Sequence, residues 1–588
     1  MEQNLLTAII YDEDDANLFL KLNPLVNRIL PITPNARAIL LECGVPLIST
    51  LEIYTDYRQA KVLARVRRTE RELLSVLENE KNLGIASKET IRGIVHVLCS
   101  ISASFWELVK DIGHCLLTDG KQWIRINDST EIHKFLLNHL QPLIKRSMIP
   151  IIAVPIFPLT VKILNIIALS FWKGKSTIFF SDYNYGLNKL RFNKMFAPYS
   201  LSIRSADGGW RDLILSIKFL LDSLFFKKTV TIVVNPSYSN KTANASRRVL
   251  NTINDSISRI VINLVQDSFI DKISLYDGSK EDISRVIDKL RPHQIISGHL
   301  RWWTPTFVAE VGKKNKIPVT LITHGTHSLP DTAIASFEQE ENIHGLMISP
   351  LSDITLLQSP HAEACAMKIG CNNGQRSRPI QWGINAKPIT SSNSSTKYIL
   401  HAGSYKTWVG PRPWIYETPD EFINGLTSLI LATSNLNNTK LIIRIRPQPD
   451  CNIKNLRKLL PKFDHFEIKS SGSFFDDMYN ADLLVSWAST TIEEALHLRK
   501  PVLLWGGSNR YFHLPPCHEF PTPQNRSAVY APEKEEDLPQ MIESVLESHA
   551  SKPLTNEELK SHVWSKNIPG IDEFAKQLSS NSYNTKYQ

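Results

Sequence analysis

Short apolar runs with the character of β-strands alternate with helical stretches from about residue 176 onward. Such runs begin near Ser176, Thr229, Lys272, His293 and Pro318, and each is followed by turn or helix signals. Strands that alternate with helices are typical of βαβ units, in which neighbouring strands pair in parallel. The pattern therefore predicts an α/β fold built on parallel sheets.

The alternation stops once and then restarts. Residues 374–397 are polar, rich in Ser and Asn and interrupted by Pro, which is typical of a linker. After them come the strand-like runs KYILHAGSYKTW, KLIIRIRPQPD, ADLLVSW and KPVLLWGG, separated by helical stretches. We predict an N-terminal domain of residues 1–385, a linker of 386–397, a second α/β domain of 398–550, and a C-terminal helix and tail of 551–588. Ligands of such domains bind where parallel strands end.

The first part of the N-terminal domain has a different sequence pattern, with an acidic turn and a charged helical segment. The chain opens with a strand, LLTAIIY, that ends in the acidic turn Asp12–Asp15. The charged segment RQAKVLARVRRTERELLSVLENEK then predicts a long surface helix, so we expect a helical insertion at about 56–128.

Two apolar segments bear on membrane contact. Met148–Trp172 is long enough to cross a bilayer, but Pro150, Pro155 and Pro158 would break a spanning helix. A buried strand followed by a core helix explains the same residues better, and a segment that dips into a membrane surface stays an alternative. Leu213–Lys228 predicts an ordinary packed helix.

Charge and cysteine content narrow the class of protein. The net charge of +9 is spread along the chain, and the basic-aromatic pattern of RNA-binding modules is missing, so we expect no nucleic-acid partner. The seven cysteines are scattered without a CxxC pair, which favours a reducing compartment and argues against structural zinc. The first 30 residues lack a secretory signal pattern, so we expect a cytoplasmic protein.

The stretch Val485–Gly507 places a polar turn between two apolar strands. Thr490 and Glu493 have the spacing of a capping box, in which the glutamate turns back to its own helix. The same spacing fits Thr491 and Glu494, but a helix has only one N-cap. One of the two glutamates is therefore left over, and a carboxylate beside a helix N-terminus is well placed to accept from the vicinal hydroxyls of a ligand whose phosphate binds there.

Ser489–Leu496, followed by Lys500-Pro501-Val502, resembles the nucleotide-sugar motif of GT-B glycosyltransferases. The resemblance implies that the turn of Ser489, Thr490 and Thr491 lies at the donor phosphates and that Glu494 takes the ribose hydroxyls. Arg499 stands where that family usually has glycine. UDP-sugar 2-epimerases of the same fold carry similar helices.

Two more stretches of the second domain carry the resemblance. KLIIRIRPQPD is similar to the Arg-x-His-Pro element of bacterial transferases that build capsule, Kdo, sialic-acid-like and polyol-phosphate polymers. It implies that Arg446 lies at the donor nucleotide, with Gln448 in place of the histidine. HAGSYKTW resembles the glycine-bearing loop that meets the donor, which implies that Ser404 and Lys406 lie there. Both GxxxxGK[ST] and GxGxxG are absent from the sequence.

The candidate catalytic groups lie in the N-terminal domain. PVTLITHGTHSLPD resembles the His-Gly turn that ends a cleft-facing strand in the same transferases, and His324 could act there as acid or base. His299, in ISGHLRWW, is predicted to line the same cleft, although either histidine could simply be a satisfied polar group. Asp12 is either part of a solvated turn or helix start, or a general base toward the acceptor. No metal cofactor is expected.

These observations predict a GT-B glycosyltransferase with two Rossmann-like domains that face each other across a cleft. A nucleotide-sugar donor, with a CMP-linked acidic sugar as the leading candidate, would give its sugar to a glycan or lipid-linked glycan acceptor. The resemblance implies synthesis of bacterial surface polysaccharide, capsule or lipopolysaccharide, on the cytoplasmic face of the inner membrane, with peripheral membrane contact left open. The alternatives are a UDP-sugar 2-epimerase-like isomerase or hydrolase, and a non-catalytic polysaccharide assembly protein.

Overall fold

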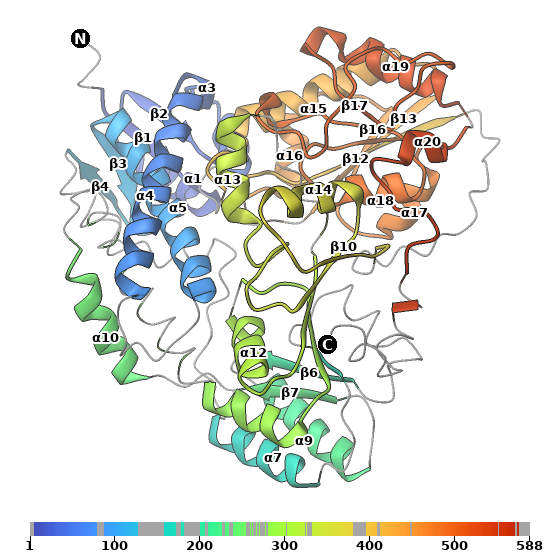
Figure 1. Ribbon diagram of the computed structural model, residues 1–588. Coiled ribbons are helices and arrows are strands. Elements are labelled where there is room, and N and C mark those ends of the chain that lie inside the picture. The colour runs from blue at the N-terminus through green and yellow to red at the C-terminus, as the bar shows by residue number, and fades with distance from the viewer. Residues whose placement is uncertain are drawn as a thin grey trace.

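The computed structural model holds three β-sheets with helices packed around them (Figure 1). The structure describes residues 5–53, 55–78, 88–127, 158–171, 178–180, 200–205, 210–225, 230–234, 239–253, 259, 262, 266, 270, 274, 277, 280–301, 303–323, 325, 332–379, 396–407, 412–446, 448, 450–550, 552–570 and 573–574.

The first sheet is formed by the N-terminal part of the chain. Its strands are β1 (Thr7–Ile10), β2 (Arg28–Pro31), β3 (Cys115–Thr118) and β4 (Trp123–Ile126), in the order β2-β1-β3-β4. β1 runs parallel to β2 and β3, and β4 is antiparallel. The helices are α1 (Glu13–Leu22), α2 (Pro34–Glu42), α3 (Thr50–Ile53), α4 (Asp56–Glu78) and α5 (Lys88–Ile112). α4 and α5 pack against each other and confirm helices in the insertion predicted at about 56–128. The predicted end of the insertion is wrong, because β3 and β4 lie within this range and belong to the first sheet.

The second sheet has seven parallel strands. They are β5 (Ile178–Phe180), β6 (Ser200–Ser205), β7 (Val230–Val234), β8 (Gln294–Ser297), β9 (Val319–Ile322), β10 (Ile354–Leu357) and β11 (Gly374–Arg376), in the order β11-β10-β9-β8-β5-β6-β7. The helices of this part are α7 (Pro158–Phe171), α9 (Trp210–Leu224), α10 (Asn240–Leu250), α12 (Trp303–Lys314), α13 (Ala333–Asn342) and α14 (Pro360–Lys368). β8 and β9 are buried along their whole length, as strands covered on both faces should be.

One predicted strand of this sheet is wrong. Ser274 and Asp277 of the run that begins at Lys272 are helical and lead into the helical residues 280–290. The apolar residues of that run recur at helical as well as strand spacing, and so short a run cannot distinguish the two.

The third sheet has six parallel strands in the order β14-β13-β12-β15-β16-β17. They are β12 (Lys397–Gly403), β13 (Thr439–Ile445), β14 (Phe466–Lys469), β15 (Leu483–Val485), β16 (Val502–Leu503) and β17 (Val529–Tyr530). The helices are α15 (Pro419–Ser434), α16 (Ile453–Leu459), α17 (Phe474–Asn480), α18 (Thr491–His497), α19 (Leu538–Ser548) and α20 (Asn556–Leu559). Alternating side chains of the strands enter two apolar cores, one on each face of the sheet.

The predicted α/β class with two doubly wound parallel sheets is confirmed. In both larger sheets the strand order reverses once, between β5 and β8 in the second and between β12 and β15 in the third. The first sheet (blue) and the third (orange to red) lie side by side, and β6 and β7 of the second lie at the opposite end of the molecule (Figure 1). The start of the polar run at 374–397 is strand β11, and not a linker. Residues 386–395 of the predicted linker are outside the described part, so the domain boundaries stay a prediction.

Among the helices that the structure describes, none combines the length and the apolar character needed to cross a bilayer.

Candidate functional site

The predicted donor-binding residues gather at one edge of the third sheet. β13, β12 and β15 are neighbours, and their carboxyl ends lie at Ile445, Gly403 and Val485. The strand order reverses between β12 and β15, and the crevice at such a reversal is where doubly wound sheets bind their ligands. The segments that leave these three strand ends hold all of the predicted donor residues, namely Ser404, Lys406, Arg446, Gln448, Ser489, Thr490, Thr491 and Glu494.

The segment between β12 and α15, residues 404–418, contacts both other parts of the molecule. We call it the junction segment; its residues 408–411 are outside the described part. Tyr405 Oη donates to the carbonyl of Ile32, directly after β2, over 3.3 Å. Glu338 of α13 is fully buried and accepts from Arg412 Nε and from the Ile415 N–H, each over 3.2 Å. The edge of the third sheet is thus fixed to the first sheet and to a helix of the second.

A lysine and a glutamate of the junction segment are joined through their backbones. The Glu417 N–H donates to the Lys406 carbonyl over 2.8 Å, in a short parallel bridge. Glu417 is only 4% exposed; its Oε1 accepts from the Gly507 N–H over 3.4 Å. Its buried Oε2 has no hydrogen-bond partner among the residues that the structure describes. A buried carboxyl with an unsatisfied oxygen is costly to keep and is common at functional sites.

Desolvation shifts the pKa values of Glu417 and Lys406 toward 7 from opposite sides. Desolvation, with a smaller contribution from Glu421, raises the pKa of Glu417 to about 7. Desolvation also lowers the pKa of Lys406 to about 8; Arg412 and Arg446 lower it further, and Glu417 opposes them. The pair can therefore gain or lose charge near neutral pH.

The turn after β16 closes over the junction segment. Gly506 and Gly507 have φ of +129° and +61°, and a Cβ on either would come within 2.5 Å of the Trp487 ring, so only glycine fits. Arg510 then holds Glu421 through both guanidinium nitrogens, Nη1 over 2.6 Å and Nη2 over 2.7 Å. This bidentate pair lowers the pKa of Glu421.

The predicted capping box at α18 is wrong. Thr490 is the N-cap, but within the described structure its side chain makes no cap hydrogen bond, because its backbone is already helical (φ −64°, ψ −10°). A capping side chain needs an extended backbone at this position. Ser489 Oγ instead accepts from the Thr491 N–H over 3.3 Å. Glu493 does not turn back to the helix start. It is buried, and its Oε1 lies 2.7 Å from Nε2 of His513.

Glu493 begins a chain of contacts that reaches the second sheet. Nδ1 of His513 lies 3.2 Å from the hydroxyl of Tyr511, whose ring lies 5.6 Å from the guanidinium of Arg412. Arg412 in turn binds Glu338 on α13. The helix predicted to hold the donor is therefore tied to the part of the molecule predicted to bring the acceptor. Glu494 is half-buried on the same helix, and its predicted contact with a ligand stays a prediction.

Arg499 adopts the backbone conformation for which glycine is usual. Its φ is +58°, its N–H donates to the Leu496 carbonyl, and the next N–H, of Lys500, donates to the Ala495 carbonyl. These bonds form a Schellman motif, which normally needs glycine at the left-handed position. Arg499 compensates by donating to the Leu554 carbonyl over 2.6 Å and to Asn556 Oδ1 over 2.5 Å.

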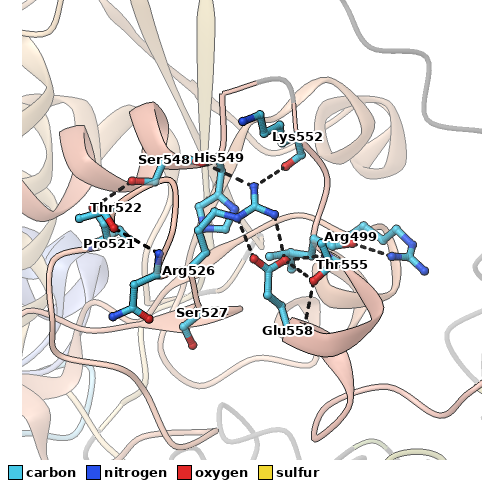
Figure 2. Close-up of polar contacts among 12 residues, drawn as sticks. Arg499, Pro521, Thr522, Arg526, Ser527, Ser548, His549, Lys552, Thr555 and Glu558 are labelled. Carbon is cyan, nitrogen blue, oxygen red and sulfur yellow. Dashed lines mark hydrogen bonds and ion pairs between the residues drawn. The ribbon is translucent and has the colours of Figure 1, made fainter.

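The segment that receives Arg499 is itself well anchored. Figure 2 shows Arg526 paired with Glu558, with Nε and Nη2 at 2.7 and 3.1 Å from the two carboxylate oxygens. Glu558 also completes a capping box with Thr555 at the start of α20. Figure 2 places Arg499 beside this cluster, so the turn after α18 keeps its shape without glycine.

The predicted catalytic residues lie outside the third sheet. Asp12 caps α1, with its Oδ1 accepting from the Asp15 N–H over 3.0 Å, and the next residue, Glu13, accepts from Asn452. His299 follows β8, and its N–H donates to Ser297 Oγ over 3.3 Å. His324 follows β9 but lies outside the described residues. Their catalytic roles stay predictions.

Sequence patterns missed Glu417 and His513. Glu417 directly precedes Thr418, which is the N-cap of α15. Thr418 forms a capping box with Glu421, and Pro419 lies in the first turn of the helix. That signal fixes the helix start and could have drawn attention to the carboxyl before it. No pattern in the sequence pairs Glu493 with a histidine 20 residues away.

Comparison with known proteins adds fold relatives only. No family model matches this chain, and no curated protein does either. Two solved structures illustrate a distant resemblance. One is a UDP-GlcNAc 2-epimerase from Neisseria meningitidis bound to UDP-GlcNAc (14% identity, TM-score 0.36, covering 69% of this chain and 98% of that one). The other is MurG from Acinetobacter baumannii (10%, 0.33, 69% and 99%).

Both transferases and epimerases are among the solved structures that resemble this chain. The spinosyn rhamnosyltransferase SpnG, complexed with spinosyn aglycone, is similar at 13% identity and a TM-score of 0.33, over 69% of this chain and 99% of that one. Likeness this distant does not distinguish the two reactions, which leaves the residues of the site as the basis for a function.

Proposed function

We propose that this protein is a glycosyltransferase that binds a nucleotide-activated sugar at the carboxyl edge of the third sheet. The observation that carries the proposal is the backbone contact of Lys406 with the buried Glu417 on the junction segment, beside the strand reversal of β12 and β15. Arg446, at the end of the neighbouring β13, acts on the same lysine electrostatically.

The charge balance at this edge favours a phosphate ligand. Arg412 and Arg446 both lie close enough to Lys406 to lower its pKa, and Arg412 also forms a direct ion pair with Glu338. A lysine whose pKa is held down by desolvation and by other cations gains most when an anion arrives. The phosphate of a nucleotide supplies that anion, and the same cations would stabilise the phosphate as it departs from the sugar.

The remaining assignments belong to the same proposal. Ser404, Gln448 and the Ser489–Thr491 turn would contact the donor, with Glu494 at the ribose. His324, His299 and Asp12 would serve the acceptor from the other two sheets. The donor would be a CMP-linked acidic sugar and the product a bacterial surface polysaccharide. The reaction would take place without a metal on the cytoplasmic face of the inner membrane, with peripheral membrane contact.

The test is thermal unfolding in the presence of CMP, CDP and UDP, followed by turnover of the matching nucleotide-sugars. A ligand that binds only the folded protein raises its melting temperature. Transfer predicts that donor is consumed only when a glycan acceptor is added. Consumption without acceptor would support the epimerase-like alternative, and no stabilisation by any nucleotide would support a non-catalytic assembly protein.

A further inference from the structure

The two contacting helices α7 and α9 present apolar side chains to solvent. Of the twenty exposed large apolar side chains among the described residues, five lie on α7 and five on α9 or directly after it. They are Leu159, Ile163, Ile166, Ile167 and Phe171 on α7, and Ile214, Ile217, Leu221, Leu224 and Phe225 on or after α9. We call this set the apolar face.

The spacing shows that each helix exposes one continuous stripe. The exposed residues recur at intervals of three and four, which places them on one side of a helix. The opposite sides are also apolar, since Val161, Leu169 and Phe219 are buried in the protein. A surface helix of a globular protein normally turns charged and polar residues outward. Packing against the core of the protein therefore explains one apolar side of each helix and leaves the exposed apolar side unexplained. An exposed apolar area of this kind marks an interaction site.

Among the residues of α7 and α9 whose side chains the structure describes, the exposed charged ones are lysines. Lys162 and Lys218 are exposed within it, whereas Asp222 of α9 is buried. Lys162 lies 3.4 Å from Asp282, which leaves Lys218 as the more available cation. The sequence adds Lys173 and Lys175 after α7, and Lys227 and Lys228 after α9. Lysines at the border of an apolar surface keep their ammonium groups in water while their stems lie on apolar atoms.

We propose that the apolar face docks on the surface of an anionic lipid bilayer. The isoleucine, leucine and phenylalanine side chains would enter the boundary between headgroups and acyl chains, and the lysines would meet lipid phosphates. A second copy of the chain fits less well, because a two-fold interface would enclose the lysines of both copies in one apolar contact. The proposal rests on the membrane contact in the proposed function and names its surface, and vesicle binding tests it without any assay of nucleotide binding or sugar transfer.

The position of this face suits a membrane-bound enzyme. Figure 1 shows α7 and α9 at the end of the molecule opposite β12, β13 and α15 of the third sheet. Binding through α7 and α9 would leave the junction segment in water, where a soluble nucleotide can reach it.

Co-sedimentation with vesicles tests the proposal directly. The full chain is mixed with vesicles of phosphatidylcholine, alone or with phosphatidylglycerol. We expect binding to the anionic vesicles that weakens with added salt, as electrostatic attraction is screened. The double variant I166D/I217D places two carboxylates on the apolar face, at side chains that are 46% and 42% exposed. We expect it to lower binding about tenfold or more, and K218Q to lower it about fivefold.

Leu25→Asp is the matched control, because Leu25 is 93% exposed and lies after α1, on the first sheet's side of the molecule. It should bind vesicles as the wild type does. All variants should melt within about 2 °C of the wild type, since exposed substitutions change stability little. Absence of wild-type binding to anionic vesicles, or unchanged binding by I166D/I217D, would overturn the proposal. So would a dimer of the wild type in light scattering that I166D/I217D abolishes, which would assign the face to a second copy.

Discussion

Nε2 of His513, in the segment that follows β16, lies 2.7 Å from Oε1 of Glu493 on α18, and both side chains are buried. The pair fixes α18 to Tyr511 and, through it, to Arg412 of the junction segment. A glutamate that the sequence assigns to a helix cap is thus part of an internal polar chain.

Replacing Glu493 should therefore cost more than the loss of a helix cap. Glu493→Ala leaves His513 without its carboxylate in a buried site, and we expect the free energy of unfolding to fall by about 2–3 kcal/mol. Glu494→Ala, on the same helix but half-buried, should lower it by less than about 0.5 kcal/mol and should instead weaken nucleotide binding. Urea unfolding and nucleotide titration of both variants separate the two effects; equal losses of stability would refute the distinction.

Glu417 should make the protein less stable as the pH rises through neutrality. Its pKa is raised to about 7 in the folded state, so the folded protein binds this proton more tightly than the unfolded chain does. The resulting stabilisation is complete below the ordinary glutamate pKa of about 4.5 and is lost as the pH rises through 7.

Glu417→Gln removes this proton-linked contribution. We expect the variant to lose the corresponding part of the pH dependence between pH 5 and 8, and to gain about 1–3 kcal/mol over the wild type at pH 8. Glu533→Gln, on a well-exposed residue, serves as the control and should follow the wild-type curve. The measurement is chemical unfolding at a series of pH values. A Glu417→Gln curve parallel to the wild type would show that Glu417 does not titrate in this range.

Arg499 offers a test of backbone strain. At φ +58°, Arg499→Ala loses the bonds to Leu554 and Asn556 and keeps a strained backbone, whereas Arg499→Gly loses the bonds and relieves the strain. We expect the glycine variant to be about 1 kcal/mol more stable than the alanine variant. At an ordinary helical position the order would be reversed, so the sign of the difference in unfolding free energy decides the matter.

The strands and their ends could be predicted from the sequence, because apolar runs and the turns that end them are local signals. β12, β13 and β15 follow those signals, and so do the positions of Lys406 and Arg446 after them. The partner of Glu493 could not be predicted, since the two residues are joined only by the path of the chain after β16. The exposed apolar side of α7 could not be predicted from the sequence either. Its apolar pattern predicts a core helix, and only the packing of α9 beside it shows that one side remains uncovered.

The pair of Lys406 and Glu417 is the centre of the proposed nucleotide site. The pKa of Lys406 is lowered to about 8, so its positive charge is present below that pH and is lost above it. Nucleotide affinity should fall as the pH rises from 7 to 9. Lys406→Met should bind weakly at all of these pH values, while Lys440→Met, on the exposed side of β13, should match the wild type.

The most direct measurement is calorimetric titration of wild-type protein, Lys406→Met and Lys440→Met with CMP, CDP and UDP at pH 7. We predict that at least one nucleotide binds the wild type and Lys440→Met equally, and that Lys406→Met lowers its affinity about tenfold or more, as expected for the loss of a charge-assisted phosphate contact. Heat from none of the three nucleotides, or equal affinity in Lys406→Met and wild type, would contradict a nucleotide site at this edge of the sheet.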